Sequence, residues 1–158
     1  MPKALRFRSL EEAENELANL QNAFPKIDTA GQWNLPVLLD HCAESLEFSC
    51  TGYPEMKPEW FRMIVGPIAK HVFLWQGKMS HNTLDPIPGD EGMPHSNTEK
   101  EAFERLFKSI SDFKTWKREV AEHFAYGKLD RAEAEKLQAF HIADHLSKIV
   151  YPQAARSN

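Results

Sequence analysis

Cysteine is scarce in this chain, and a long apolar run is missing. The two cysteines, Cys42 and Cys50, lie on one predicted helix about 12 Å apart along its axis, too far for a disulfide. We therefore expect free thiols in a reducing, cytoplasmic setting. The most apolar stretch, 63–75, is interrupted by a Gly-Pro pair and a Lys-His pair, so it is too short and too polar to span a bilayer.

Strong charge of one sign is also absent. The formal net charge is −4, and there is no basic tract and no Gly-rich phosphate loop, so we expect no nucleic-acid partner. The first eight residues carry no apolar run after their charges, which argues against a secretory signal. With 158 residues, the chain is expected to form one domain over 1–158 with one core.

Most of the structural patterns in the sequence are typical of α-helices. Capping boxes or N-cap residues precede amphipathic stripes at Ser9, Asn34, Thr98 and Asp130, and each predicts the start of a main helix. The predicted helices run over 10–22, 35–50, 99–126 and 131–149, with a further helical region over 58–77 that Gly66-Pro67 must break or kink. No strand is predicted. The expected fold is all-α: four main helices, with a long crossover containing the broken helix between the second and third.

A Pro/Gly-rich segment over 78–97 interrupts the helical pattern. Loops of this length are usually functional lids or disordered linkers. The apolar residues Leu84, Ile87 and Met93 favour a loop that packs against the bundle. The loop carries four titratable side chains: Asp85, Asp90, Glu91 and His95. They either close over a site or belong to a solvated turn, and the sequence favours neither interpretation.

Two histidines near the C-terminal end, His141 and His145, are four positions apart on a predicted helix. This spacing puts both rings on one face, one turn apart, as a single metal ion requires. Ile142 stands where a zinc protease of the HExxH type has its glutamate, so that reading is excluded. His41 lies on the apolar stripe of the second main helix and would be the third ligand. The alternative is that these are buried core histidines.

Other side chains receive a structural interpretation. Cys42 is expected to be a small core residue rather than a ligand. Glu44 lies one turn from His41 and would either hydrogen-bond a ligand ring or face solvent, and we favour the second. The remaining histidines are predicted to be structural or solvent-facing: His71, His81, His95 and His123.

Several segments of the chain resemble a known family. The segment Trp33 to His41 is similar to the "W-x-L-x-x-x-L-x-H" entry to the second helix of the DinB/YfiT-like superfamily, and the HxxxH of the last helix matches its second motif. Ser49-Cys50-Thr51-Gly52-Tyr53-Pro54, Ile87-Pro88-Gly89 and the segment 123–129 resemble the branch called domain of unknown function 1569. These pieces span nearly the whole chain in order.

The resemblance implies a DinB-like four-helix bundle with a divalent metal held by His41, His141 and His145. Imidazole ligands suit zinc, nickel and iron alike. Relatives often carry a second histidine directly before the last one, where this chain has Asp144, so a contact beside the site is expected to differ. The superfamily includes transferases of low-molecular-weight thiols. Its members and the frequency of two-fold oligomers both favour a homodimer.

Two functions remain open at this point. One is a metal-dependent enzyme, a thiol-dependent transferase or a hydrolase, that acts on a small molecule or a thiol; no catalytic acid or base is assigned. The other is a non-catalytic helical module that binds a ligand or partner with its pocket or an apolar face. Four tryptophans would supply such a face, although core positions explain aromatic residues more often: Trp33, Trp60, Trp75 and Trp116.

Overall fold

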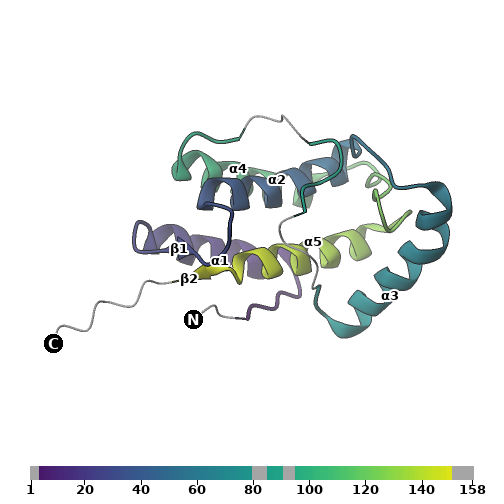
Figure 1. Cartoon of the computed structure of the whole chain (residues 1–158), viewed down its shortest axis with the longest axis horizontal. Coiled ribbons are helices and arrows are strands. Elements are labelled where there is room, and N and C mark those ends of the chain that lie inside the picture. The colour runs from purple at the N-terminus through teal and green to yellow at the C-terminus, as the bar shows by residue number, and fades with distance from the viewer. Residues whose placement is uncertain (1–3, 80–84, 91–94, 151–158) are drawn as a thin grey trace.

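The computed structural model describes residues 4–79, 85–90 and 95–150. It is mostly helical, as predicted. Figure 1 shows the arrangement of its elements: α1 (Leu10–Ala23), β1 (Asp28–Thr29), α2 (Leu35–Thr51), the π-helical turn η1 (Phe61–Val65), α3 (Gly66–Gln76), α4 (Glu99–Thr115), α5 (Arg131–Leu146) and β2 (Ile149–Val150).

All four predicted main helix starts are confirmed. The side chains of Ser9, Asn34, Thr98 and Asp130 each accept a hydrogen bond from the backbone N–H three residues later, which satisfies a donor that the first turn leaves open. At Asp130 the capping box is complete. At the starts of α1 and α4 the glutamate reaches one residue further back, to the N–H before the cap.

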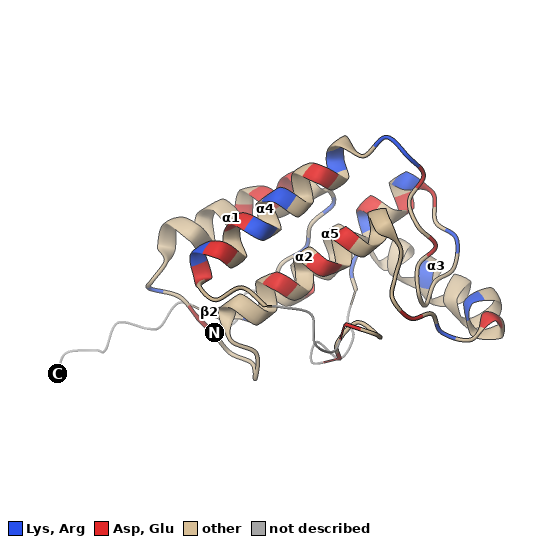
Figure 2. Ribbon diagram, turned by 90° about the horizontal axis from the view of Figure 1, so that it is seen from above, with Lys and Arg blue, Asp and Glu red and all other residues tan. Residues whose placement is uncertain are grey.

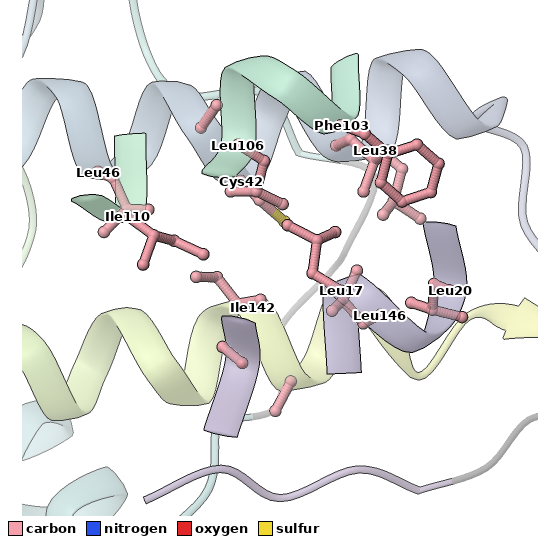
Figure 3. Close-up of a cluster of buried hydrophobic side chains, with 14 of the residues drawn as sticks. Leu17, Leu20, Leu38, Cys42, Leu46, Phe103, Leu106, Ile110, Ile142 and Leu146 are labelled. Carbon is pink, nitrogen blue, oxygen red and sulfur yellow. The ribbon is translucent and has the colours of Figure 1, made fainter. Parts of the chain in front are cut away.

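Four helices enclose the main core. Helix α2 packs against α4 and α5, and α1 packs against the same two helices from the other side. Figure 3 shows their apolar side chains meeting, among them Leu17 of α1, Cys42 of α2, Leu106 of α4 and Ile142 of α5, all fully buried. Cys42 is thus a core residue, as predicted, and both cysteines are free thiols. Burial raises the pKa of the Cys42 thiol, which keeps it protonated and unreactive.

The crossover between α2 and α4 holds the extra helix, interrupted near the predicted position. The chain enters η1 as a π-helical turn and continues as α3 from Gly66 without leaving the helical region. Because Pro67 has no N–H to donate, the wider turn accommodates it at the start of α3. Helix α3 ends at Gln76, and the residue that caps it, Gly77, has a left-handed φ of 63°. In Figure 1, α3 lies at one end of the molecule and touches the bundle through α5.

The prediction that the third main helix continues to Gly127 is wrong. Helix α4 ends at Thr115, because the Arg131 guanidinium of α5 donates to the carbonyls of its last turn, including Phe113 and Trp116. A side chain distant in sequence therefore satisfies carbonyls that would otherwise favour another turn. Residues 116–130 form a connection with one antiparallel bridge between residues 123 and 127.

The structure also bears on the predicted absence of strands and on the packing of the loop. A two-residue antiparallel pair joins β1 to β2, with Asp28 opposite Val150, where the sequence predicted no strand; so short a pair carries no period-2 pattern. In the loop, Ile87 is buried against Phe48 and Tyr53, as expected, whereas Leu84 and Met93 lie outside the described residues. Each helix in the described part of the chain is too short or too polar to span a bilayer.

Candidate metal centre

The structure brings the three predicted histidines together between α2 and α5. The two helices are antiparallel, since His41 meets His141 while Ser45, one turn further along α2, meets Gln138, one turn back along α5. His145 lies one turn beyond His141, and its ring centroid is 4.6 Å from those of both other histidines. All three side chains are buried, so three titratable rings share one corner of the bundle.

The geometry of these rings fits a divalent metal ion. One nitrogen from each histidine can be chosen so that all three lie within 4.8 Å of one another. The Nε2 atoms of His41 and His141 are 3.1 Å apart. Two nitrogens bound to one zinc at tetrahedral angles would be roughly 3.3–3.4 Å apart, given Zn–N bonds of about 2.0–2.1 Å. The His41–His141 pair is therefore close to the separation that a shared zinc ion requires, and a nitrogen of His145 lies within 4.8 Å of a nitrogen of each.

An aromatic side chain covers the histidines on one side. Trp33, the residue before the N-cap of α2, stacks on His145 with an interplanar angle of 4° and a centroid distance of 5.8 Å, and it lies 4.8 Å from His41. Thr29 fixes the backbone beneath it by donating to the Trp33 carbonyl. Trp33 thus limits the rotation of two rings and shields them from water, a role that the sequence did not assign to it.

A row of buried polar side chains continues from the histidines along the α2–α5 seam. Ser45 Oγ donates to Gln138 Oε1, and Gln138 Nε2 donates to the Ser45 backbone carbonyl and to Ser49 Oγ. Ser49 Oγ also lies 3.0 Å from the Tyr53 hydroxyl, and burial raises the pKa of that phenol. Both N–H donors of the Gln138 side chain are therefore used within the protein, and they fix the register of α5 against α2.

The adjacent face of α2 carries three carboxylates against one guanidinium from α4. Arg105 lies 3.4 Å from Asp40 and 3.3 Å from Glu44, and it forms a two-point pair with Glu47. Asp40 also accepts from the backbone and hydroxyl of Ser96, which holds the start of α4 against α2. The shared guanidinium offsets part of the cost of burying Asp40 and Glu44, whereas Glu47 is partly exposed to solvent.

The sequence-based preference for a solvent-facing Glu44 is wrong. Its side chain is 1% exposed, because α4 packs over this part of α2 and Arg105 neutralises it. Burial raises the pKa of Glu44, and Arg105 opposes part of that rise. A carboxylate oxygen of Glu44, one of Asp90 and a nitrogen of His41 also lie within 4.8 Å of one another. Asp90 therefore approaches the histidine site, one of the two options that the sequence left open for it.

A cleft opens onto two of the three histidines. It has a volume of about 460 Å³, and its walls come from α2, η1, α3, the segment 85–88, the turn 123–126 and α5. His41 and His141 are among its lining residues, and apolar side chains such as Phe61, Phe73 and Leu137 form most of its surface. The size is within the usual range of small-molecule sites.

One cleft residue, His123, lies where sequence reasoning placed the last turn of a helix. The structure instead places it in the turn 123–127, where Gly127 has a φ of 75° and a Cβ on Gly127 would lie 2.9 Å from the Arg62 carbonyl. The N–H groups of Ala125 and Tyr126 donate to its Nδ1 over 3.1 and 3.2 Å. Since Nδ1 accepts, the ring proton is on Nε2. Burial lowers the pKa of His123 to about 3.

The other histidines are consistent with the structural interpretation. His71 is exposed on α3 and bonds the Pro67 carbonyl of its own helix. His95 is half-exposed, with Nδ1 3.8 Å from Asp40. His81 and Glu91 lie outside the described residues. Asp85 lines the cleft.

Comparisons with known proteins give a family but no activity. Residues 1–152 match a family model described as "Protein of unknown function (DUF1569)". Searches of curated proteins and of solved structures gave no significant match. Because the matched region covers almost the whole chain, including all three clustered histidines, the protein belongs to the DUF1569 family.

Proposed function

We propose that this protein is a metal-dependent enzyme whose single divalent ion, zinc, nickel or iron, is held by His41, His141 and His145. The observation that carries the proposal is the meeting of three buried imidazoles from two antiparallel helices, with nitrogens within 4.8 Å of one another, beside a cleft of about 460 Å³. Neutral imidazoles leave the ion its full charge, so a bound metal would supply Lewis-acid chemistry toward a molecule in the cleft.

The chain's own residues prepare this corner for catalysis. Trp33 stacks on His145 and keeps that ring in one orientation, while the Ser45–Gln138 bonds hold the two helices at a fixed distance. The cleft reaches His41 and His141, so a substrate can approach from that side. A thiol-dependent transferase and a hydrolase both fit this layout, with a small molecule or a thiol as the substrate.

The resemblance of the sequence to the DinB/YfiT-like superfamily supports the proposal. The four helices, the crossover with an extra helix and the order of the three histidines agree with that resemblance. Within the superfamily, thiol transfer is the activity that we would examine first.

The test compares metal-loaded protein, chelator-treated protein and a His145→Ala variant. Each is assayed on a panel of aryl esters and amides, with and without an added low-molecular-weight thiol. Turnover that needs both the metal and His145 supports the enzyme, and dependence on the thiol separates a transferase from a hydrolase. Metal-loaded protein that turns over no member of the panel faster than the His145→Ala variant would favour a non-catalytic ligand-binding module.

A further inference from the structure

The cleft combines an apolar wall with very few polar groups that can serve a ligand. Among its polar residues, Ser45 and Gln138 are hydrogen-bonded to each other, and the second N–H of the Gln138 side chain donates to Ser49 Oγ. Lys57 and Asp85 are exposed residues of opposite charge. Away from the histidines, the buried residues that line the described part of the cleft thus carry no formal charge that would compensate an ionic ligand.

His123 differs from these groups in having a fixed donor to offer. Its Nδ1 accepts from two backbone N–H groups, so the neutral ring carries its proton on Nε2. The rings of Phe124 and Tyr126 stack on it at centroid distances of 4.6 and 4.3 Å, and Tyr53 lies 4.9 Å away. The imidazole is therefore held in one orientation and one tautomer at the wall of the cleft.

The turn that carries His123 is itself rigidly seated. Its ends form the bridge between residues 123 and 127, with backbone hydrogen bonds in both directions. Gly66, at the start of α3, lies so close that a Cβ there would overlap the Ala125 carbonyl oxygen. The Phe124 carbonyl accepts from the Lys57 N–H at 2.9 Å. A preorganised donor of this kind loses little entropy when it binds an acceptor.

We propose that this cleft binds a small, uncharged molecule with an apolar body and a carbonyl-type oxygen, and that His123 Nε2–H donates a hydrogen bond to that oxygen. The apolar walls accommodate the body, and a neutral donor held in one orientation selects for an acceptor rather than for an anion. The inference rests on the proposed function only for the bound molecule's role as substrate; binding itself needs no metal.

Two substitutions separate the donor from the rest of the ring. In His123→Asn the amide oxygen can take the place of Nδ1 and keep the two backbone bonds, while no donor reaches the Nε2 position. In His123→Phe both functions are lost, so a stability change in that variant alone reports on the turn. Ala69→Trp is the control for the cleft, because Ala69 lines it and a large side chain there would fill it.

The experiment uses acetophenone and ethylbenzene, a ketone and a hydrocarbon of similar size, titrated into chelator-treated protein and followed by amide chemical shifts. We expect wild type to bind acetophenone more tightly than ethylbenzene. His123→Asn should weaken acetophenone about threefold to tenfold, the value of one neutral hydrogen bond, and leave ethylbenzene unchanged. Ala69→Trp should abolish both. Equal loss of both ligands in His123→Asn, or no binding of either by wild type, would overturn the proposal.

The same titration in a His145→Ala variant distinguishes this inference from the proposed metal site. His145 is not among the cleft residues, so the preference for the ketone should persist there. Metal binding without a His123-dependent preference would refute the ligand class alone. A His123-dependent preference in a protein that binds no metal would refute the enzyme alone.

A separate observation concerns the outer face of η1 and α3, which we call the α3 face. Its apolar side chains are exposed and recur along one side: Trp60, Met63, Ile64, Ile68, Val72 and Trp75, between 41% and 87% exposed. Nearby cations are held toward the rest of the molecule, since Arg62 pairs with Glu122 and Lys70 pairs with Glu133. In Figure 2 the ribbon of α3 is almost entirely free of charged residues.

The area of the α3 face points to a second copy of this chain as its occupant, and we infer a homodimer formed through it. Since a tryptophan can bury up to about 250 Å², the six side chains at these exposures offer roughly 700 Å². This exceeds the roughly 300–600 Å² of the largest patch on most monomers and approaches the roughly 800 Å² per partner of a stable interface. The lack of formal charge lets the face pack against itself.

Sedimentation velocity over a concentration series tests the dimer, with Ile68→Asp as the disrupting variant. Phe24→Ser, an exposed apolar residue elsewhere, is the control. We expect a concentration-dependent dimer in wild type and control, and a monomer in Ile68→Asp with an unchanged helical spectrum. A wild type that stays monomeric, or a dimer that survives Ile68→Asp, would overturn the inference. So would a monomer that binds phosphatidylcholine–phosphatidylglycerol vesicles through this face.

Discussion

The buried imidazole of His123 makes a quantitative prediction about stability in acid. Burial lowers its pKa from 6.5 to about 3 in the folded protein. Between these values the unfolded chain binds one more proton than the folded chain at this site, so the stability due to this histidine is complete above pH 6.5 and falls as the pH falls. Each pH unit in that window is worth about 1.4 kcal/mol.

From pH 7 to pH 5, His123 should therefore cost the wild type about 2 kcal/mol of its free energy of unfolding. The His123→Asn variant has no group to protonate there and can keep the two bonds to Ala125 and Tyr126 N–H. Urea unfolding of both proteins at both pH values gives a double difference in which the other titrating groups cancel. We expect the wild type to lose about 2 kcal/mol more than the variant.

Two results would refute this reasoning about His123. One is an equal pH dependence of stability in wild type and His123→Asn. The other is a ring C–H resonance of His123 that titrates near pH 6.5 in the folded protein. Long-range proton–nitrogen spectra should also show the Nε2–H tautomer, and a protonated Nδ1 would contradict the hydrogen bonds on which the account depends.

Three further predictions concern packing and charge. Arg105→Met should lower the free energy of unfolding by about 3–5 kcal/mol at pH 7, because it leaves buried carboxylates of α2 uncompensated. Denaturant unfolding curves should show that part of this loss is recovered at pH 4, where these carboxylates become protonated. Gly66→Ala should lower the free energy of unfolding by about 1–3 kcal/mol despite better helix propensity, whereas Gly31→Ala, with open space around it, should be near neutral. Leu106→Ala, in the fully buried core, should cost about 2–5 kcal/mol in the same assay.

Helix starts were predictable because their signals are local. A capping side chain and the N–H that it satisfies lie three residues apart, so Ser9, Asn34, Thr98 and Asp130 could be identified from short segments. The end of α4 was not predictable in this way. The apolar stripe continues past it, and the group that terminates it, Arg131, arrives from another helix.

The same distinction applies to the candidate site. His141 and His145 share a helix, so their spacing alone placed them on one face, and the resemblance added His41. The polar side chains beside the histidines are brought together only by the packing of different helices. Ser45 of α2, for example, bonds Gln138 of α5. Gln138 is three residues before His141 on the same face, a weak signal that could have been used. His123 lies in a turn whose sequence is typical of the end of a helix. Neither the burial nor the tautomer of its ring could therefore be predicted.

The central claim is that His41, His141 and His145 hold one divalent ion, and the metal content of untagged protein tests it most directly. Elemental analysis should find about one zinc, nickel or iron per chain. Alanine at any of the three positions should remove most of it without unfolding the bundle, and His71→Ala, an exposed histidine on α3, should leave it unchanged. Metal-free wild type from metal-supplemented growth, or a content that the three substitutions do not reduce, would contradict the account.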